Sequence, residues 1–165
     1  MKIRTIALFL IVLAGVCSAQ DMPVGWVKPP DKLTRQDFRR TDPNHFLIAT
    51  GDFNGDGVQD KAVLLVNQRI HKLGFFVCLT TEAGCDWHRL ETMDIAFLDV
   101  MGIAKVKPGQ YETACGKGYG ECGKDEPVKR STKRDAVEFF KDESASSVYV
   151  YNPRTHKFFS VATSD

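Results

Sequence analysis

At residues 51–66 the chain reads Gly-Asp-Phe-Asn-Gly-Asp-Gly-Val-Gln-Asp-Lys-Ala-Val-Leu-Leu-Val. The first ten residues are dominated by glycine and by oxygen-bearing side chains, whereas Ala62 to Val66 are all apolar. A short apolar run that directly follows a turn is typical of a strand buried on both faces. This stretch therefore predicts a tightly curled acidic loop that is followed directly by a buried strand of a sheet.

The curled loop carries oxygen ligands at regular spacing. Calcium is a hard cation that takes six to eight oxygen ligands, and a loop with alternate side chains facing inward can supply them. Two glycines, Gly55 and Gly57, permit the positive φ angles that such a curl needs. Three clustered carboxylates would also repel one another without a cation. The sequence therefore predicts a calcium site formed by the side chains of Asp52, Asn54, Asp56 and Asp60 and the carbonyl of Val58.

This loop is not a complete EF-hand, because the twelfth position from Asp52 is Val63 and not a bidentate Glu. It resembles the FG-GAP or VCBS-type repeat, whose signature is Gly-Asp-Phe-Asn-Gly-Asp-Gly followed by Asp and an apolar strand. The resemblance covers Gly51 to Val66 only and implies a calcium loop that joins two strands. The alternative is a solvated turn that binds no metal.

Short strand-like segments with frequent turn signals continue to the end of the chain, and no long segment has helical periodicity. A single helical turn is expected near Thr34 to Arg39. The fold class predicted is mostly β: an antiparallel meander, open barrel or propeller-like sheet with the calcium loop between two strands. The expected strands are Phe46–Ala49, Lys61–Val66, Gly74–Thr80, Trp87–Thr92, Val100–Val106, Tyr111–Ala114, Pro127–Ser131, Ala136–Lys141, Ser147–Tyr151 and Lys157–Ala162.

The N-terminus predicts export to the periplasm. Lys2 and Arg4 precede an apolar run, and small residues up to Ala19 form a signal-peptide cleavage site, so residues 1–19 are interpreted as a signal peptide. Lipidation of Cys17 is the alternative, and it would tether the protein to a membrane. An irregular segment, 20–44, and a single β-rich domain, 45–165, are expected to follow.

Removal of residues 1–19 takes two of the 22 basic residues and leaves 20 against 21 acidic ones. A near-neutral domain gives no reason to expect binding to nucleic acid or to anionic lipid. Four cysteines remain, and an oxidising compartment favours disulfides over a zinc site, which would need closely spaced pairs. The spacing favours two local pairs among the three possible pairings, namely Cys78–Cys85 and Cys115–Cys122.

A glycine-rich loop lies between the last two cysteines, with Lys117, Tyr119 and Glu121 as its only large side chains. A disulfide across the loop would restrict its freedom. A preorganised loop that offers an aromatic ring and a cation suits insertion into the cleft of another protein. The alternative is a stapled surface hairpin without a partner.

Cys115-Gly116-Lys117-Gly118-Tyr119 is similar to the Ser-Gly-x-x-Tyr loop of bacterial periplasmic lysozyme inhibitors, with Cys in place of Ser. The combination of signal peptide, calcium loop and this loop also resembles immunity proteins against secreted peptidoglycan-hydrolase effectors. The resemblance implies that Gly116 and Tyr119 contact the active site of a lysozyme-like glycoside hydrolase. We add Lys117 to these expected contact residues, because its positively charged ammonium suits the acid pair of a glycosidase. Replacement of Ser by Cys removes a hydroxyl expected to bond a catalytic carboxylate.

No enzymatic activity is predicted. The four histidines show no metalloprotease spacing, and the carboxylates near the second cysteine pair are interpreted as solvated side chains. Two alternatives to an inhibitor stay open. One is a calcium-binding adhesion or scaffold module, and the other is a hydrolase that uses unrecognised carboxylates.

Overall fold

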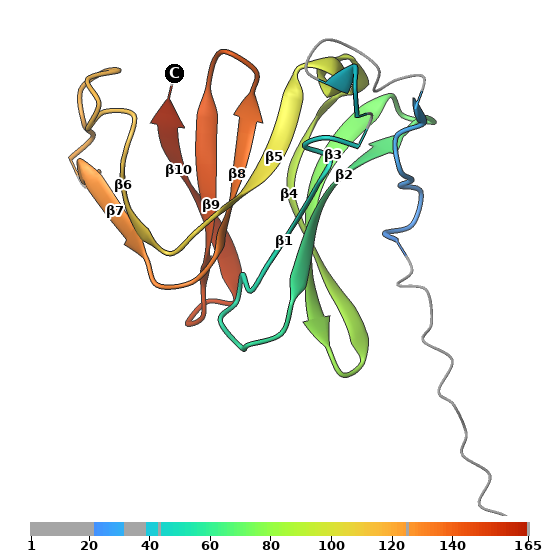
Figure 1. The fold of residues 1–165 in the computed structure, drawn as a ribbon, viewed down its shortest axis with the longest axis horizontal. Helices are drawn as coiled ribbons and strands as arrows, with labels where there is room; N and C mark the ends of the chain where they lie inside the picture. Colours follow the sequence, from blue (N-terminus) through green and yellow to red (C-terminus); the bar gives the residue numbers. More distant parts are fainter. Residues whose placement is uncertain (1–21, 32–38, 43, 125, 165) are drawn as a thin grey trace, which may run out of the picture.

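The structure is a computed structural model that describes residues 22–31, 39–42, 44–124 and 126–164. Its described part contains ten strands and a 3₁₀ helix (Figure 1). In chain order these are β1 (Ile48–Gly51), β2 (Asp60–Asn67), β3 (Lys72–Thr81), β4 (Gly84–Asp94), η3 (Ile95–Asp99), β5 (Met101–Val106), β6 (Gly109–Glu112), β7 (Lys129–Thr132), β8 (Ala136–Lys141), β9 (Ser146–Asn152) and β10 (Lys157–Ser164).

All strand pairs are antiparallel and form three sheets. Sheet 1 is the meander β1-β2-β3-β4, sheet 2 has the order β10-β9-β8-β5, and β6 and β7 form a hairpin. The mostly β, antiparallel prediction is confirmed, in its meander form, and the described strands close into no barrel. Each of the ten expected strands overlaps an observed one, whereas η3 was not predicted.

Sheets 1 and 2 pack face to face around one apolar core. Strand β2 contributes Ala62, Leu64 and Val66 to this core, all fully buried. Across the core the ring of Phe75 on β3 stacks on Phe139 of β8, with centroids 5.1 Å apart. A backbone hydrogen bond from Ile103 to the carbonyl of Phe46 further joins the start of β1 to β5.

The other face of sheet 1 is also covered. Val63 and Leu65 of β2 are buried there with Trp26, whose ring lies edge-on to Phe76 at 4.9 Å. Val27 pairs with Val66 in an isolated antiparallel bridge, which fixes this N-terminal segment along the edge of β2. Strand β2 is therefore buried on both faces, as its apolar run predicts.

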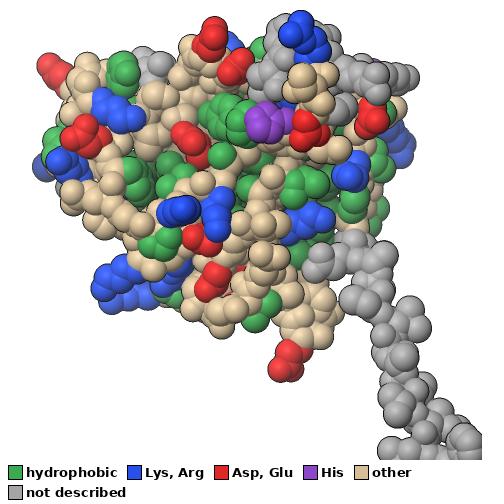
Figure 2. Space-filling model, viewed as in Figure 1, with side chains coloured by type: hydrophobic (Ala, Val, Ile, Leu, Met, Phe, Trp, Pro, Cys, Tyr) green, Lys and Arg blue, Asp and Glu red, His purple; other side chains and the backbone are tan. Residues whose placement is uncertain are grey.

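The outer face of sheet 2 is only partly covered. Ala136, Val148 and Val150 are buried there, and Tyr111 of the β6–β7 hairpin packs on them. Figure 1 shows the hairpin standing beside sheet 2, away from sheet 1. The space-filling view shows basic, acidic and hydrophobic side chains interspersed over the visible face, with no extended area of one charge (Figure 2). The hairpin carries the cysteine-closed loop, so this arrangement positions that loop.

Two predictions concern residues outside the described ranges. The signal peptide, residues 1–19, and most of the expected helical turn near Thr34 to Arg39 belong to these segments. Within the described ranges, no helix has both the length and the apolar character needed to cross a bilayer.

Candidate functional site

The predicted calcium loop connects β1 to β2, as expected, and is organised by its own carboxylates. The Asp52 carboxylate accepts hydrogen bonds from three backbone N–H groups: Oδ1 from Gly55 at 2.7 Å and Asp56 at 3.1 Å, and Oδ2 from Gly57 at 3.0 Å. Gly55 and Gly57 have φ angles of 83° and 85°, a left-handed conformation that glycine adopts at little cost. The curl expected from the two glycines is therefore present.

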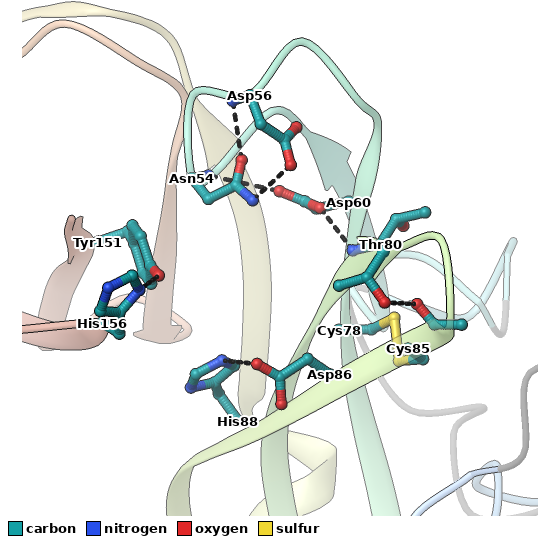
Figure 3. A network of polar contacts seen from close by, with 12 residues as sticks. Asn54, Asp56, Asp60, Cys78, Thr80, Cys85, Asp86, His88, Tyr151 and His156 are labelled. Carbon is teal, nitrogen blue, oxygen red and sulfur yellow. Dashed lines mark hydrogen bonds and ion pairs between the residues drawn. A yellow bond between two sulfur atoms is a disulfide. The ribbon is translucent and has the colours of Figure 1, made fainter.

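Asp60 fastens the loop to sheet 1 (Figure 3). Its side chain is buried at the start of β2, with Oδ2 accepting from the N–H of Phe53 at 2.9 Å and Oδ1 from the N–H of Thr80 on β3 at 2.9 Å. Burial raises the pKa of Asp60 above its ordinary 3.8, and these N–H donors oppose that shift. A cation beside the carboxylate would offset the same cost of burial.

Asn54 and Asp56 lie at the exposed tip of the loop. The Asn54 amide donates to Asp56 Oδ2 at 2.8 Å, and Asp56 Oδ1 accepts from the N–H of Val58 at 2.7 Å. The hydrogen bond from Asn54, followed by the one from Val58, lowers the pKa of Asp56. This carboxylate is therefore ionised at neutral pH and open to solvent.

The five predicted ligands thus share one loop, and their hard oxygen donors fit calcium in chemical type. Their carboxylates are engaged with backbone N–H groups, although a carboxylate has about four lone-pair sites and retains room for a cation. In the described ranges, no three His, Cys, Asp or Glu side chains gather into a group that could hold a metal ion. Calcium binding by this loop stays a prediction.

Both predicted disulfides are confirmed. The Sγ atoms of Cys78 and Cys85 are 2.06 Å apart across the β3–β4 hairpin, and those of Cys115 and Cys122 are 2.01 Å apart. The second bond closes the glycine-rich loop that follows β6. Below, the disulfide loop means residues 115–122.

Tyr119 projects from the disulfide loop, where 54% of it is exposed. It lies between Gly118 and Gly120, whose φ angles of 89° and 137° belong to the left-handed region. These glycines let the backbone turn sharply on both sides of one aromatic residue. Glu121 beside it is exposed as well.

The base of the disulfide loop is tied to β10. The N–H of Ala114 donates to the carbonyl of Ala162 at 2.8 Å, and the Lys117 ammonium donates to the carbonyl of Thr163 at 2.7 Å. Lys117 thus points toward this chain's own last strand. Gly116 is required by space, since a Cβ there would lie 2.0 Å from the carbonyl oxygen of Val128.

A polar network that the sequence does not suggest lies where β4 meets the β9–β10 turn (Figure 3). His88 Nε2 is 3.1 Å from Asp86 Oδ2, and the Tyr151 hydroxyl is 3.1 Å from His156 Nδ1. The rings of His88 and Tyr151 meet edge to face, with centroids 6.4 Å apart. His88 and Tyr151 are 63 positions apart in the sequence, so no local spacing could reveal the contact.

The chain was compared with protein-family models, curated proteins and solved structures, and none of the three comparisons finds a match.

Proposed function

We propose that this chain is an exported, periplasmic inhibitor or immunity protein that blocks a lysozyme-like peptidoglycan hydrolase. The observation that carries the proposal is the exposed Tyr119 at the end of a loop closed by Cys115–Cys122. Aromatic residues that stand on rigid supports are the usual anchors of tight protein interfaces. The disulfides are in keeping with an oxidising compartment.

The disulfide loop acts as a preformed insert. The disulfide, the Lys117–Thr163 hydrogen bond and the close fit of Gly116 hold its base, so little conformational entropy is lost on binding. In the cleft, the Tyr119 hydroxyl donates to one of the two catalytic carboxylates, and its ring blocks the sugar subsite. Inhibition is stoichiometric, and no residue of this chain is catalytic.

The metal has a supporting role in this proposal. Calcium bound by Asp52, Asn54, Asp56, Asp60 and the Val58 carbonyl would neutralise the carboxylates at the end of sheet 1. These residues lie in the β1–β2 loop and at the first position of β2, whereas the disulfide loop is anchored on β10 of sheet 2. The metal would therefore stabilise the sandwich that carries the loop and not touch the hydrolase.

The test is a titration of mature protein into peptidoglycan hydrolysis by a panel of glycosidases, including any hydrolase encoded beside it. Wild type is compared with Tyr119→Ala and with Ile70→Ala. Ile70, on the β2–β3 turn, is exposed to the same 54% and is a matched control for removal of an exposed apolar side chain. We expect inhibition near a one-to-one ratio for wild type and Ile70→Ala, and about 100-fold weaker inhibition for Tyr119→Ala.

Failure to inhibit any member of the panel would reject the proposal. The alternative would then be a calcium-binding adhesion or scaffold module, which the acidic β1–β2 loop favours. Hydrolysis of peptidoglycan by the purified protein alone would instead indicate an enzyme.

A further inference from the structure

The outer face of sheet 2 has two adjoining hollows of about 380 Å³ and 250 Å³, and Tyr111 and Glu112 of the β6–β7 hairpin line the second. Ala104, Phe140 and Ser146 line the first hollow, and Val106 and Val148 line the second. Glu138 of β8 lines both. Glu138 is paired with Ala104 of β5 on one side and with Val148 of β9 on the other. Because Glu138 lines both, the two hollows lie next to each other, and the pair is called the trough below.

Glu138 is half-buried in the floor of the trough between two apolar neighbours. Within the described part of the chain its carboxylate makes no hydrogen bond or ion pair. Lys117 and Lys141 also line the hollows, yet neither is paired with it. A carboxylate that is partly removed from water without a partner is unfavourable, and a cation in the trough would satisfy it.

Two other half-buried carboxylates differ from Glu138, namely Asp135 just before β8 and Glu91 on β4. Asp135 accepts from the backbone N–H of Asp52 at 3.1 Å and lies 3.5 Å from the Lys105 ammonium. Glu91 accepts from the Tyr149 hydroxyl at 2.5 Å. These two are satisfied within the chain, whereas Glu138 is not.

The first hollow has a further feature of a binding site. The rings of Phe46 and Phe140 meet edge to face at 5.0 Å on its wall, and aromatic faces attract cations.

The trough is continuous with the disulfide loop. Lys117 of that loop lines the second hollow together with Thr163, to which it is hydrogen-bonded. A protein that received Tyr119 in its cleft would therefore have its rim beside the trough.

We propose that the trough binds a basic side chain, lysine or arginine, of the same protein partner, with Glu138 as its counter-ion. This inference rests on the proposed function in one respect, namely that the partner is a hydrolase. The trough itself is defined by its own residues and can be tested without any hydrolase.

The first experiment titrates ¹⁵N-labelled protein with acetyl-lysine amide and acetyl-arginine amide, with acetyl-norleucine amide as the uncharged match. We expect saturable amide shifts at Ala104, Glu138 and Val148 with the two cations only. Glu138→Gln should weaken this binding about tenfold, as expected for a partly buried ion pair. Glu82→Gln, at the exposed β3–β4 turn, should change nothing. No shifts in the trough, or equal shifts with the norleucine probe, would overturn the inference.

The second experiment measures affinity for a hydrolase that wild type inhibits, using Glu138→Gln and Glu138→Lys. Both should raise the dissociation constant, the lysine variant by about 100-fold or more through like-charge repulsion. If wild type binds the cationic probes in the trough but both variants bind the hydrolase with unchanged affinity, the assignment of the trough to this interface is overturned. Cation binding without inhibition of any hydrolase would reject the proposed function and leave the trough as a cation site.

Discussion

The Lys117 ammonium donates a 2.7 Å hydrogen bond to the carbonyl oxygen of Thr163, 46 positions away in the sequence. Because Thr163 is buried at the end of β10, this contact ties the disulfide loop to sheet 2. The loop is therefore part of the sandwich and not a free appendage.

Lys117→Met tests how much the Lys117–Thr163 hydrogen bond contributes to stability. Methionine keeps an unbranched side chain but cannot donate to Thr163, so the free energy of unfolding should fall by about 1 kcal/mol. The measurement is urea unfolding, with amide line widths at Tyr119 as a report on loop motion. Lys124→Met, an exposed lysine just after the loop, is the control. Equal stability of the two variants would show that the contact contributes nothing.

Gly116→Ala and Gly109→Ala form a matched pair. A Cβ at Gly116 would lie 2.0 Å from the Val128 carbonyl oxygen, whereas a Cβ at Gly109 meets nothing within 4 Å. The clash should lower the melting temperature and cost about 1–3 kcal/mol, and Gly109→Ala should be near neutral. Thermal unfolding followed by circular dichroism checks both. A Gly116→Ala variant as stable as wild type would contradict the close packing of Gly116 on the backbone of Val128, the residue just before β7.

Calcium should raise the melting temperature of the wild type. At 100 times its dissociation constant a ligand that binds only the folded state adds about 2.7 kcal/mol. Asp56→Asn keeps the acceptor for the Val58 N–H but removes the charge and the acceptor for the Asn54 amide at the exposed tip, so it should weaken calcium binding with only a small loss of stability in EDTA. Asp42→Asn is the control, because Asp42 accepts from the Asn44 N–H in a similar turn outside the loop. Calorimetric titration is the measurement, and no heat of binding to wild type would exclude the site.

Tyr149 should govern stability at high pH. Burial raises the pKa of Tyr149 above its ordinary 10, and the hydrogen bond to Glu91 and the charge of Glu91 raise it further. The unfolded chain therefore loses this proton first as pH rises, so stability from neutral Tyr149 is complete below pH 10 and falls above it. Tyr149→Phe should cost about 1–2 kcal/mol at pH 7 and flatten the decline above pH 10.

Unfolding by urea between pH 7 and 11 checks this prediction. Tyr119→Phe, with an exposed ring, is the control for loss of one phenol. An unchanged slope in Tyr149→Phe would show that another group causes the decline.

Local sequence determined most of the strands. The apolar run of β2, the β-branched and aromatic residues of β9 and the glycine-rich turns each contain their signal within a few residues. The two disulfides could also be predicted from the sequence, because each joins cysteines with a sequence separation of 7 across a local turn. The 3₁₀ helix η3 was missed, since its apolar segment Ile95–Asp99 resembles a strand and is helical through the Asp94 cap.

The sequence by itself thus determined the β class, the curled acidic loop and the cysteine pairs, because these depend on residues close along the chain. Only the tertiary structure decided the direction of Lys117, the His88–Tyr151 contact and the position of Glu138 without a partner. Each depends on which strands become neighbours and which face they turn outward. That choice is made by packing the whole core of the two sheets, and no short stretch of sequence contains it.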